Sequence, residues 1–359
     1  MAYSARIDGL ARKLAAARLD ALVITHLPNI RYLCGFSGSA ALLVITLRHA
    51  VVFTDGRYRE QARTEIHGCQ VKIGPGAPLV QAAQWLAKKA SLRRVGVEAA
   101  HLTIADRNQL NKALNKHSTL VEAPPLVEQM RMVKDPSEIA SIRAACRLGS
   151  KLLDLLLRKL RPGVAETLVA GELEFAARKL GADQMSFPTI IAGGQRSALP
   201  HGRASGAVLP QRGFVVCDFG VILLGYCSDM TRTLHLGRLD RMAKDGYQAV
   251  LEAQLAALES VRPGRTVGDV DSAARSSLKR RRLDKFFSHS TGHGVGLEIH
   301  EAPRVGAGAT DVLQAGMVIT IEPGIYLPGK WGVRIEDTVV VTETGCEILT
   351  NSRKELITL

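Results

Sequence analysis

Residues 288–303 of the chain read SHSTGHGVGLEIHEAP, a stretch in which histidines are interleaved with glycines. Three of the ten histidines lie here within twelve residues, at positions 289, 293 and 300. Glycine at positions 292, 294 and 296 disfavours a helix and lets another backbone or a ligand approach closely. Imidazoles on such a ribbon suit metal binding or proton transfer. The stretch predicts a functional site, against the alternative of a glycine-rich turn with incidental histidines.

An apolar hairpin before this stretch carries two aspartates. Residues 214–233 read FVVCDFGVILLGYCSDMTRT, and Asp218 and Asp229 punctuate its strand-like runs. A turn centred on Leu223 and Leu224 would make the two aspartates cross-strand partners. Their Cβ atoms would then lie ~5 Å apart on one face of the hairpin.

A second apolar hairpin, after the histidine stretch, carries two glutamates. Residues 317–338 read MVITIEPGIYLPGKWGVRIEDT, and a turn centred on Gly329 places Glu322 opposite Glu336. Two carboxylate pairs on apolar strands repel each other and incur a desolvation cost unless cations compensate. Four carboxylates and one imidazole therefore form a natural ligand set for two divalent ions.

Length, composition and net charge limit the class of protein and the partners that the chain can have. The chain has 359 residues, of which 46% are hydrophobic and 23% are charged, and this predicts a globular protein of two domains. The net charge of +13 could attract acidic proteins or nucleic acid. However, the densest basic cluster, residues 279–282, ends a predicted helix, where cations complement the helix dipole. Aromatic residues make up only 4% of the chain, too few for base-stacking platforms, so a nucleic-acid partner is not favoured.

The cysteines and the N-terminal residues indicate the cellular compartment in which the protein is expected to work. The six cysteines form no CxxC pair, and several lie in apolar runs, which is typical of free thiols in a reducing compartment. The first residues lack the apolar core of a secretory signal. No apolar run approaches the ~20 residues needed to span a bilayer. These features predict a soluble, cytoplasmic protein without a membrane partner.

The order of apolar patterns predicts an α/β N-terminal domain over residues 1–125, a linker over residues 126–136 and a second domain over residues 137–359. A helix is expected over residues 4–18, and strands then alternate with helices. The expected strands are residues 21–25, 40–46, 50–54, 70–73 and 94–98, and the expected helices are residues 57–66, 79–89 and 104–115. Pro124-Pro125 marks the boundary, and a long helix is expected to start after Pro136.

The second domain contains an internal repeat. Arg-Pro-Gly occurs at 161–163 and again at 262–264, each time followed by a predicted helix, over 166–180 and 267–281. Further on, Asp218-Phe-Gly220 in the first unit corresponds to Glu322-Pro-Gly324 in the second. A pseudo-twofold axis would bring the two hairpins together, with the site between the halves. His201-Gly202 precedes the first hairpin as the histidine stretch precedes the second.

These residues resemble the pita-bread metallopeptidases, specifically the branch of Xaa-Pro aminopeptidases and prolidases. The resemblance spans essentially the whole chain and includes three further stretches: YLCGFSG at 32–38, FTDGRY at 53–58 and RMVKDPSEI at 131–139. It implies an α/β N-terminal domain, an α+β pita-bread C-terminal domain with an internal pseudo-twofold repeat, and a homodimer. Methionine aminopeptidases share the ligands, but the separate N-terminal domain favours the proline-directed branch.

The resemblance also implies a dinuclear metal site. Its ligands would be Asp218, Asp229, His293, Glu322 and Glu336. Asp229, His293 and Glu322 would bind one ion and Asp218 the other, with Glu336 and Asp229 bridging both. The oxygen-rich set favours Mn²⁺, and Co²⁺ or Zn²⁺ would also fit it. Two ions ~3.5–4 Å apart lower the pKa of a shared water, so a bridging hydroxide would be the nucleophile.

Five residues are candidates for the catalytic work around these ions. Glu322 would carry the water proton to the proline nitrogen. His201 and His300 would stabilise the tetrahedral oxyanion. Arg334 would hold a carboxylate ligand, and His289 would either support the ligands from outside or be a structural residue.

The leading prediction is a metal-dependent exopeptidase that removes the residue before proline from the N-terminus of peptides. An Xaa-Pro bond lacks the N–H by which other proteases hold a substrate backbone, and the stretch at 53–58 favours an aminopeptidase. The runner-up is an Xaa-Pro dipeptidase (prolidase), which needs a cation for the free proline carboxylate, and no cation has a spacing that points into the site. Two further classes compete with both: a non-catalytic peptide- or nucleic-acid-binding module on this fold, and a hydrolase of a small non-peptide C–N bond.

Overall fold

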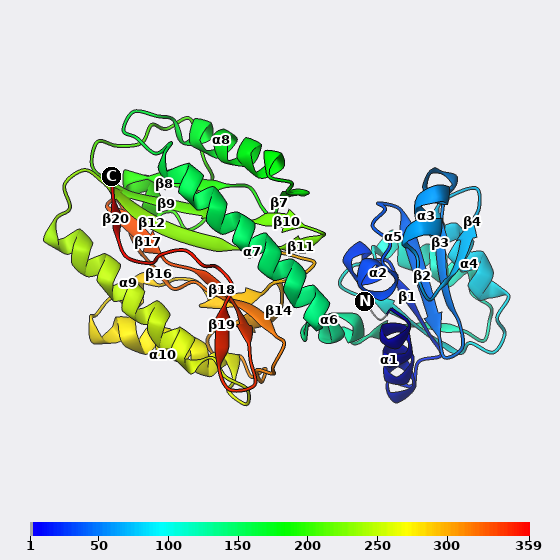
Figure 1. Cartoon of the computed structure of the whole chain (residues 1–359). Coiled ribbons are helices and arrows are strands. Elements are labelled where there is room, and N and C mark those ends of the chain that lie inside the picture. Colours follow the sequence, from blue (N-terminus) through cyan, green and yellow to red (C-terminus); the bar gives the residue numbers. More distant parts are fainter. Residues whose placement is uncertain (1–2) are drawn as a thin grey trace. The chain divides into compact units, whose positions relative to one another are not determined.

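The computed structural model describes residues 3–359, which divide into two compact units (Figure 1). The first unit ends at Arg131 and the second begins at Met132. Helix α6, Leu126–Arg131, occupies part of the stretch that we predicted as a linker, and the next helix begins at Pro136. The limits 126–136 of that linker stay a prediction.

The first unit is built on a six-stranded sheet in the order β4-β3-β2-β1-β5-β6. Its strands are β1 (Ala21–Ile24), β2 (Ala41–Thr46), β3 (Ala50–Thr54), β4 (Gln70–Ile73), β5 (Arg94–Glu98) and β6 (Thr119–Ala123). The central strand β1 pairs antiparallel with β2 and parallel with β5, and all four of its residues are buried. A strand that is apolar throughout is covered on both faces of its sheet.

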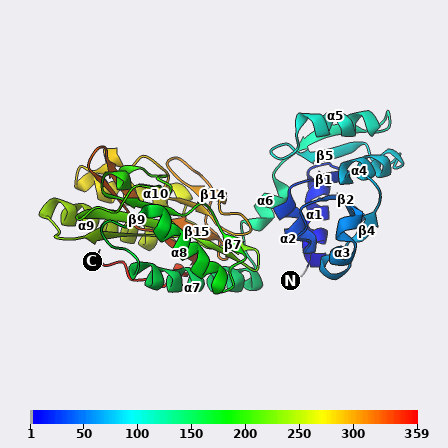
Figure 2. The same cartoon turned by 90° about the horizontal axis from the view of Figure 1, so that it is seen from above.

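Helices cover both faces of this sheet (Figure 2). They are α1 (Tyr3–Ala16), α2 (Leu27–Cys34), α3 (Arg59–Glu65), α4 (Pro78–Ala87) and α5 (Ile104–Ala113), with a 3₁₀ turn at Gly56–Tyr58. Helix α1 buries Ile7, Leu10 and Leu14 on one face, as its periodicity predicted. The α/β class of this unit is confirmed. Helix α2 and strand β6 were not predicted.

The second unit consists of two similar halves (Figures 1 and 2). In the first half, α7 (Pro136–Leu157) and α8 (Glu166–Lys179) share an apolar core with a four-stranded sheet, β20-β12-β9-β8. In the second half, α9 (Arg241–Ser260) and α10 (Val267–Arg280) pack on a five-stranded sheet, β14-β13-β15-β18-β19. The helix pairs lie on opposite sides with the sheets between them, so the fold is the predicted α+β arrangement.

The strands of the second unit are short. They are β7 (Gln184–Met185), β8 (Ile190–Gly193), β9 (Gly213–Phe219), β10 (Val221–Leu223), β11 (Tyr226–Cys227), β12 (Met230–Leu236), β13 (Gly292–Gly294), β14 (Glu301–Val305), β15 (Val318–Ile321), β16 (Gly324–Leu327), β17 (Trp331–Arg334), β18 (Asp337–Val341), β19 (Cys346–Ile348) and β20 (Ile357–Thr358). Two 3₁₀ turns, Gly194–Ala198 and Asp284–Phe286, each precede a strand of the site.

The internal repeat is confirmed at the level of individual hydrogen bonds. Gly163 and Gly264 both have left-handed backbones, with φ of 83° and 84°. The Gly163 N–H donates to Leu209 O at 2.9 Å, and the Gly264 N–H donates to Leu313 O at 3.0 Å. Helices α8 and α10 then start at equivalent positions and are both 14 residues long. Each Arg-Pro-Gly is therefore the same turn, which ties a helix to the loop before the strands of its own half.

One predicted hairpin register is confirmed and the other is wrong. Strands β16–β17 pair Gly324 with Arg334, and β15–β18 pair Ile321 with Asp337, as a turn centred on Gly329 requires. In the first hairpin, however, Asp218 pairs with Thr231 and not with Asp229. The predicted partner of Asp218 thus differs from the observed one by two residues. Because side chains alternate between the two faces with a period of two residues, Asp218 and Asp229 still lie on the same face of the hairpin.

The β16–β17 hairpin packs against α9 through Trp331. Its ring lies 5.3 Å from the ring of Phe214. A Cβ atom at Gly246 of α9 would lie 2.3 Å from the Trp331 ring, so the glycine makes room for it. The contact fixes the start of the strand that ends at Arg334.

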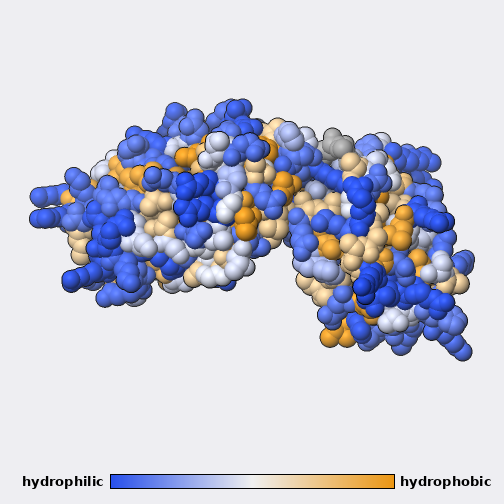
Figure 3. Space-filling model, turned by 90° about the horizontal axis from the view of Figure 1, so that it is seen from below, coloured by the Kyte–Doolittle hydropathy of each residue, from blue (hydrophilic) through white to orange (hydrophobic). Residues whose placement is uncertain are grey.

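The surface of the second unit is mainly hydrophilic in the view of Figure 3. The basic cluster at 279–282 is exposed where α10 ends, and Arg281 pairs with Glu252 at 2.7 Å. This agrees with a solvated helix end. Across residues 3–359, the structure contains no helix with the length and apolarity needed to cross a membrane.

Candidate metal centre and active site

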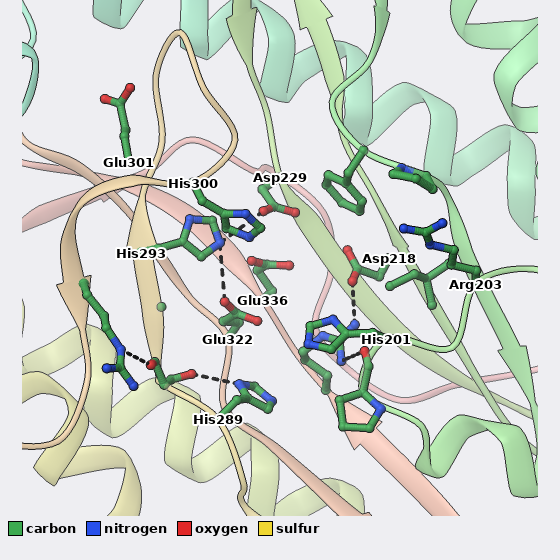
Figure 4. A pocket seen from close by; sticks show the side chains of 18 of the residues that line it. His201, Arg203, Asp218, Asp229, His289, His293, His300, Glu301, Glu322 and Glu336 are labelled. Carbon is green, nitrogen blue, oxygen red and sulfur yellow. Dashed lines mark hydrogen bonds and ion pairs between the residues drawn. The ribbon is translucent and has the colours of Figure 1, made fainter. Parts of the chain in front are cut away.

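A cavity of about 840 Å³ in the second unit brings together all the site residues predicted from the sequence (Figure 4). They are His201, Asp218, Asp229, His289, His293, His300, Glu322, Arg334 and Glu336. Its walls also include apolar residues such as Phe187, Pro188 and Ile190. A concave site with a few convergent polar groups is where a small substrate would bind.

Strand ends from both halves place the ionisable side chains. Asp218 lies near the end of β9, and Asp229 directly precedes β12. His293 is the middle residue of β13, Glu322 follows β15, and Glu336 lies between β17 and β18. The first half thus contributes the aspartates, and the second contributes the histidine and the glutamates. The predicted location between the halves is therefore where the cluster lies.

The orientation of His293 leaves one ring nitrogen facing the carboxylates. Its Nδ1 lies 3.0 Å from the carbonyl oxygen of Gly294, so Nδ1 carries the proton. Its Nε2 lies 3.5 Å from both Asp229 Oδ2 and Glu322 Oε1. Burial, with the nearby His300, lowers the pKa of His293 to about 4. The ring is therefore neutral, with a lone pair aimed at the cluster, which is the form that ligates metals.

The carboxylates of the cluster have strongly perturbed acidities. Burial, together with repulsion from the nearby Asp218, raises the pKa of Glu336 to about 8. Burial, followed by repulsion from Glu336, also raises the pKa of Asp229 and that of Glu322 well above their ordinary values. A buried group of this kind ionises fully only when bound cations offset the repulsion.

The donor set fits divalent cations. Asp229, His293 and Glu336 offer ligand atoms that lie within 4.8 Å of one another. Oδ1 of Asp218 is buried and has no hydrogen-bond partner among residues 3–359. Oxygen-rich sites with one imidazole suit Mn²⁺, Co²⁺ or Zn²⁺. The residues present therefore match the requirements of a metal centre.

The glycines of the histidine stretch allow close strand packing. A Cβ atom at Gly292 would lie 1.9 Å from the carbonyl oxygen of Thr320. One at Gly294 would lie 2.2 Å from the carbonyl oxygen of Ala302. The backbone N–H of His293 also donates to Thr320 Oγ1 at 3.1 Å. Glycine on each side of His293 is thus required for β13 to fit between its neighbours.

A hydrogen-bonded chain leads from Asp218 to His289. Arg334 donates to Asp218 Oδ2 through Nη2, and to the Tyr326 hydroxyl through Nη1 at 2.6 Å. Tyr326 in turn lies 2.8 Å from His289 Nε2, and His289 Nδ1 lies 2.8 Å from the carbonyl oxygen of Ser290. Burial lowers the pKa of His289 to about 4, so Nδ1 donates and Nε2 accepts from Tyr326. Among residues 3–359, the hydrogen bonds that link His289 to the carboxylates therefore run through Tyr326 and Arg334.

Tyr326 was not predicted, although the sequence contained a signal for it. Gly324 is the registered partner of Arg334, and Tyr326 follows it by two residues. It therefore shares the face of Arg334.

The other two histidines line the same cavity. The His300 ring lies 4.3 Å from that of His293 in an edge-on arrangement, and burial lowers its pKa. His201 is exposed on the loop between β8 and β9, next to Pro200, whose carbonyl oxygen accepts from Arg334 Nη1 at 3.0 Å. Both rings can contact a bound substrate.

Two arginines that were not predicted also line the cavity. Arg203 lies on the same loop between β8 and β9 as His201, and Arg304 lies on β14. The Arg304 Nε–H donates to Ser290 Oγ at 2.7 Å, so its guanidinium is held from one side. Neither residue has a spacing in the sequence that points to the carboxylates, since each reaches the cavity only through the fold of its loop or strand.

Comparison with known proteins identifies the class that this fold and site define. Residues 140–343 match Metallopeptidase family M24, and residues 6–133 match the Creatinase/Prolidase N-terminal domain. The chain belongs to this family of metallopeptidases, in agreement with the resemblance noted from its motifs, and it is an enzyme with the pita-bread fold.

Three of the proteins to which the chain is similar are named for Xaa-Pro bonds. The chain is 37% identical to an Xaa-Pro dipeptidase of Pyrococcus horikoshii over 340 residues, which cover 94% of this chain and 95% of the relative. A solved structure of an Xaa-Pro dipeptidase from Bacillus anthracis matches with a TM-score of 0.96 and 38% identity, covering 99% of this chain and all of that one. An X-Pro aminopeptidase from Thermotoga maritima matches with a TM-score of 0.88 and 34% identity, covering 97% and 100%.

Proposed function

We propose that the protein is a metal-dependent Xaa-Pro dipeptidase. The observation that carries this proposal is the presence of two guanidinium groups, Arg203 and Arg304, in the cavity that holds the carboxylate cluster. A dipeptidase needs a cation for the free proline carboxylate, and Arg binds carboxylates well. Two of the similar proteins named above are Xaa-Pro dipeptidases. Aminopeptidase action, our leading prediction from the sequence, becomes the alternative.

Five residues would hold two divalent ions. These residues are Asp218, Asp229, His293, Glu322 and Glu336. The bound ions would activate a water and polarise the scissile carbonyl. We propose Mn²⁺ as the native metal because carboxylate oxygens dominate the ligand set. Activity and thermal stability after metal removal and reloading with Mn²⁺, Co²⁺ or Zn²⁺ would test this.

The remaining steps belong to the side chains. Glu322 takes the proton of the attacking water on a carboxylate oxygen and delivers it to the proline nitrogen, which leaves as an amine. His201 and His300 donate to the oxygen that becomes negative as the carbonyl is attacked. Arg334 holds Asp218 in place, and His289 fixes Arg334 through Tyr326. None of these contacts needs an N–H on the substrate bond, which proline lacks.

Substrate length is the test of this proposal. After addition of Mn²⁺, we expect an Xaa-Pro dipeptide to be cleaved at least tenfold more efficiently than its C-terminally extended tripeptide. The extended substrate would cover the guanidinium without supplying an anion for it, at a cost of ~1–3 kcal/mol. We also expect Arg203→Gln or Arg304→Gln to raise KM for the dipeptide while changing tripeptide cleavage little. Equal or better cleavage of the tripeptide by the wild type would favour the aminopeptidase.

We further propose that the protein works as a homodimer in the cytoplasm on small proline-containing peptides. The dimer rests on the resemblance to the proline-directed branch of the family, and the compartment rests on the cysteine pattern of the sequence. Light scattering coupled to gel filtration would measure the mass of the assembly. A monomer that is fully active would contradict the dimer.

A further inference from the structure

Glu166, at the start of α8, is buried and lies outside the metal cluster. Only 1% of its side chain is exposed, and its carboxylate is paired with Arg196 at 3.0 Å. Removing a carboxylate from water is costly, and such a group is retained where several donors converge on it. The groups that donate hydrogen bonds to Glu166 therefore indicate its structural role.

Those partners lie at the two ends of one loop. The His201 loop, residues 193–205, connects β8 to the segment before β9 and carries His201 and Arg203. Oε1 of Glu166 accepts from the backbone N–H of Gly193 at 3.0 Å. Oε2 accepts from the backbone N–H of Ser205 at 3.1 Å and from its hydroxyl at 2.8 Å. A single carboxylate thus joins both ends of the loop that brings these two side chains to the cavity.

Arg196 extends the same connection to the far part of the loop. Its Nε–H donates to both oxygens of Glu166, at 3.1 and 3.0 Å. Its Nη2 donates to the carbonyl oxygen of Arg203 at 2.8 Å. The backbone of Arg203 is thereby held by a guanidinium that Glu166 itself orients.

The other half of the second unit contains an equivalent buried carboxylate that is hydrogen-bonded to an arginine and to a loop. Asp271 on α10 is fully buried and accepts from the N–H and hydroxyl of Thr291, at 3.2 and 2.8 Å. Arg275 donates to Asp271 at 2.7 Å and to the carbonyl oxygen of His289 at 2.6 Å. Asp271 therefore holds the segment that carries His289 and leads into His293. The two halves differ in which residues are held in this way. In the first half they lie on the loop that would contact the substrate, and in the second half they lead into the proposed metal ligand His293.

We propose that Glu166 is a positioning residue that sets the place of His201 and Arg203, whereas Asp271 sets that of the metal-ligating segment. The inference rests on the proposed function for the roles of His201 and Arg203. The two carboxylates therefore act on different steps, Glu166 on the fit of the peptide and Asp271 on metal binding.

Glu166→Gln is the first test, because an amide of the same shape cannot accept all these hydrogen bonds. We expect amide hydrogen exchange of residues 193–205 to accelerate at least tenfold in the metal-free protein. The content of two metal ions should stay unchanged, and kcat/KM for the Xaa-Pro dipeptide should fall at least tenfold, with the larger part in KM. Asp271→Asn should instead lower metal content.

Glu172→Gln is the matched control, since Glu172 lies on the same helix, is 56% exposed and pairs with Lys159 at 2.9 Å. It should leave exchange, metal content and kinetics unchanged. Arg196→Lys is a second variant in case Glu166→Gln fails to fold. It keeps the cation but loses the fork that reaches Arg203, and it should show an intermediate acceleration of exchange.

Unchanged exchange of residues 193–205 in both variants would overturn the proposal. So would accelerated exchange with kcat/KM within threefold of the wild type, because the loop would then not need to be held. The exchange and metal measurements use no substrate. They therefore remain informative even if the wild type proves not to cleave Xaa-Pro dipeptides.

Discussion

Arg334 supplies one positive charge to the cluster of four carboxylates, Asp218, Asp229, Glu322 and Glu336. It contacts Asp218 directly, and its other contacts are to Tyr326, Thr231 and a backbone carbonyl. Burial, together with repulsion from Asp218, raises the pKa of Glu336 to about 8 although the Arg334 guanidinium acts in the opposite direction. Metal ions would supply the missing charge, and each ligand should therefore affect both metal content and rate.

Asp229→Ala tests the role of Asp229 as a metal ligand. We expect loss of metal and a fall in activity on the order of 100-fold or more, since even outer supporting residues of metal sites contribute 10–100-fold. Metal analysis and cleavage of an Xaa-Pro dipeptide would measure both effects. Two bound ions with activity near that of the wild type would rule out the assignment.

Glu322→Gln separates proton transfer from binding. The amide cannot take up a proton from the attacking water, so kcat should fall roughly 10²–10⁴-fold. KM for the dipeptide should change much less, because Glu322 is not assigned to substrate binding. Steady-state kinetics with saturating Mn²⁺ would measure the two constants. A variant that retained the wild-type kcat would contradict the shuttle role.

At the scale of elements, the position of a turn limited what could be predicted. Asp218 and Asp229 were recognised from their strand contexts, but their pairing was placed two residues away. The turn is centred on Leu224 and Gly225, which both have left-handed backbones, with φ of 54° and 80°. Two left-handed residues make the tight turn that hairpins prefer, and leucine is a rare choice for it. The Pro328-Gly329 loop carried an ordinary turn signal, and its register was predicted correctly.

Elements without a strong local signal were also missed. Helix α2 has no side-chain cap at its N-terminus and spans only eight residues. Arg203, Arg304 and Tyr326 belong to the site through the folding of loops and hairpins, which spacing along the chain does not reveal. The four carboxylates were found because they lie in two strongly apolar hairpins, and His293 was found because it lies in the stretch where histidines are interleaved with glycines.

Gly292→Ala tests the close packing of β13. The new methyl group would overlap the carbonyl oxygen of Thr320, so β13 must shift. We expect a loss of ~1–3 kcal/mol of unfolding free energy, together with reduced metal content. Chemical denaturation and metal analysis would measure these changes.

Gly171→Ala is the matched control. Gly171 is an exposed residue within α8, and a Cβ atom there would meet nothing within 4 Å. Alanine should stabilise the helix by ~0.5–1 kcal/mol and leave metal content unchanged. If Gly292→Ala and Gly171→Ala had the same effects on stability and metal content, the close contact with Thr320 would not explain why residue 292 is a glycine.

At the scale of the whole molecule, the duplication was the most informative feature of the sequence. The two Arg-Pro-Gly turns have the same backbone hydrogen bond and start helices of equal length. A repeat of this kind predicts where the halves meet, and hence where the carboxylates converge. The repeat does not specify how each half uses its own loop, which depends on contacts such as those of Glu166 and Asp271.

The stability of the metal-free protein should depend on pH in a defined direction. Glu336 has a folded-state pKa of about 8, so it resists ionisation in the folded protein. Stability is therefore lost as pH rises toward 8. His289 and His293, with pKa values lowered to about 4, act oppositely, but only below their ordinary value of 6.5.

Between pH 6.5 and 8, the carboxylates therefore dominate. We expect the Tm of the metal-free protein to fall across this interval and the stabilisation by added Mn²⁺ to grow. Calorimetry at several pH values, with and without metal, would measure both trends. A Tm that rose from pH 6.5 to 8 without metal would contradict the cluster described above.

Trp331, whose ring packs between Phe214 and Gly246, offers an optical signal for the second unit. The chain has two tryptophans, and the other, Trp85, lies in α4 of the first unit. In a Trp85→Phe variant, indole fluorescence would come from Trp331 alone, on the strand that ends at Arg334. Arrival of metal at the carboxylates could then be followed in a stopped-flow instrument, as a change in emission before any peptide is added.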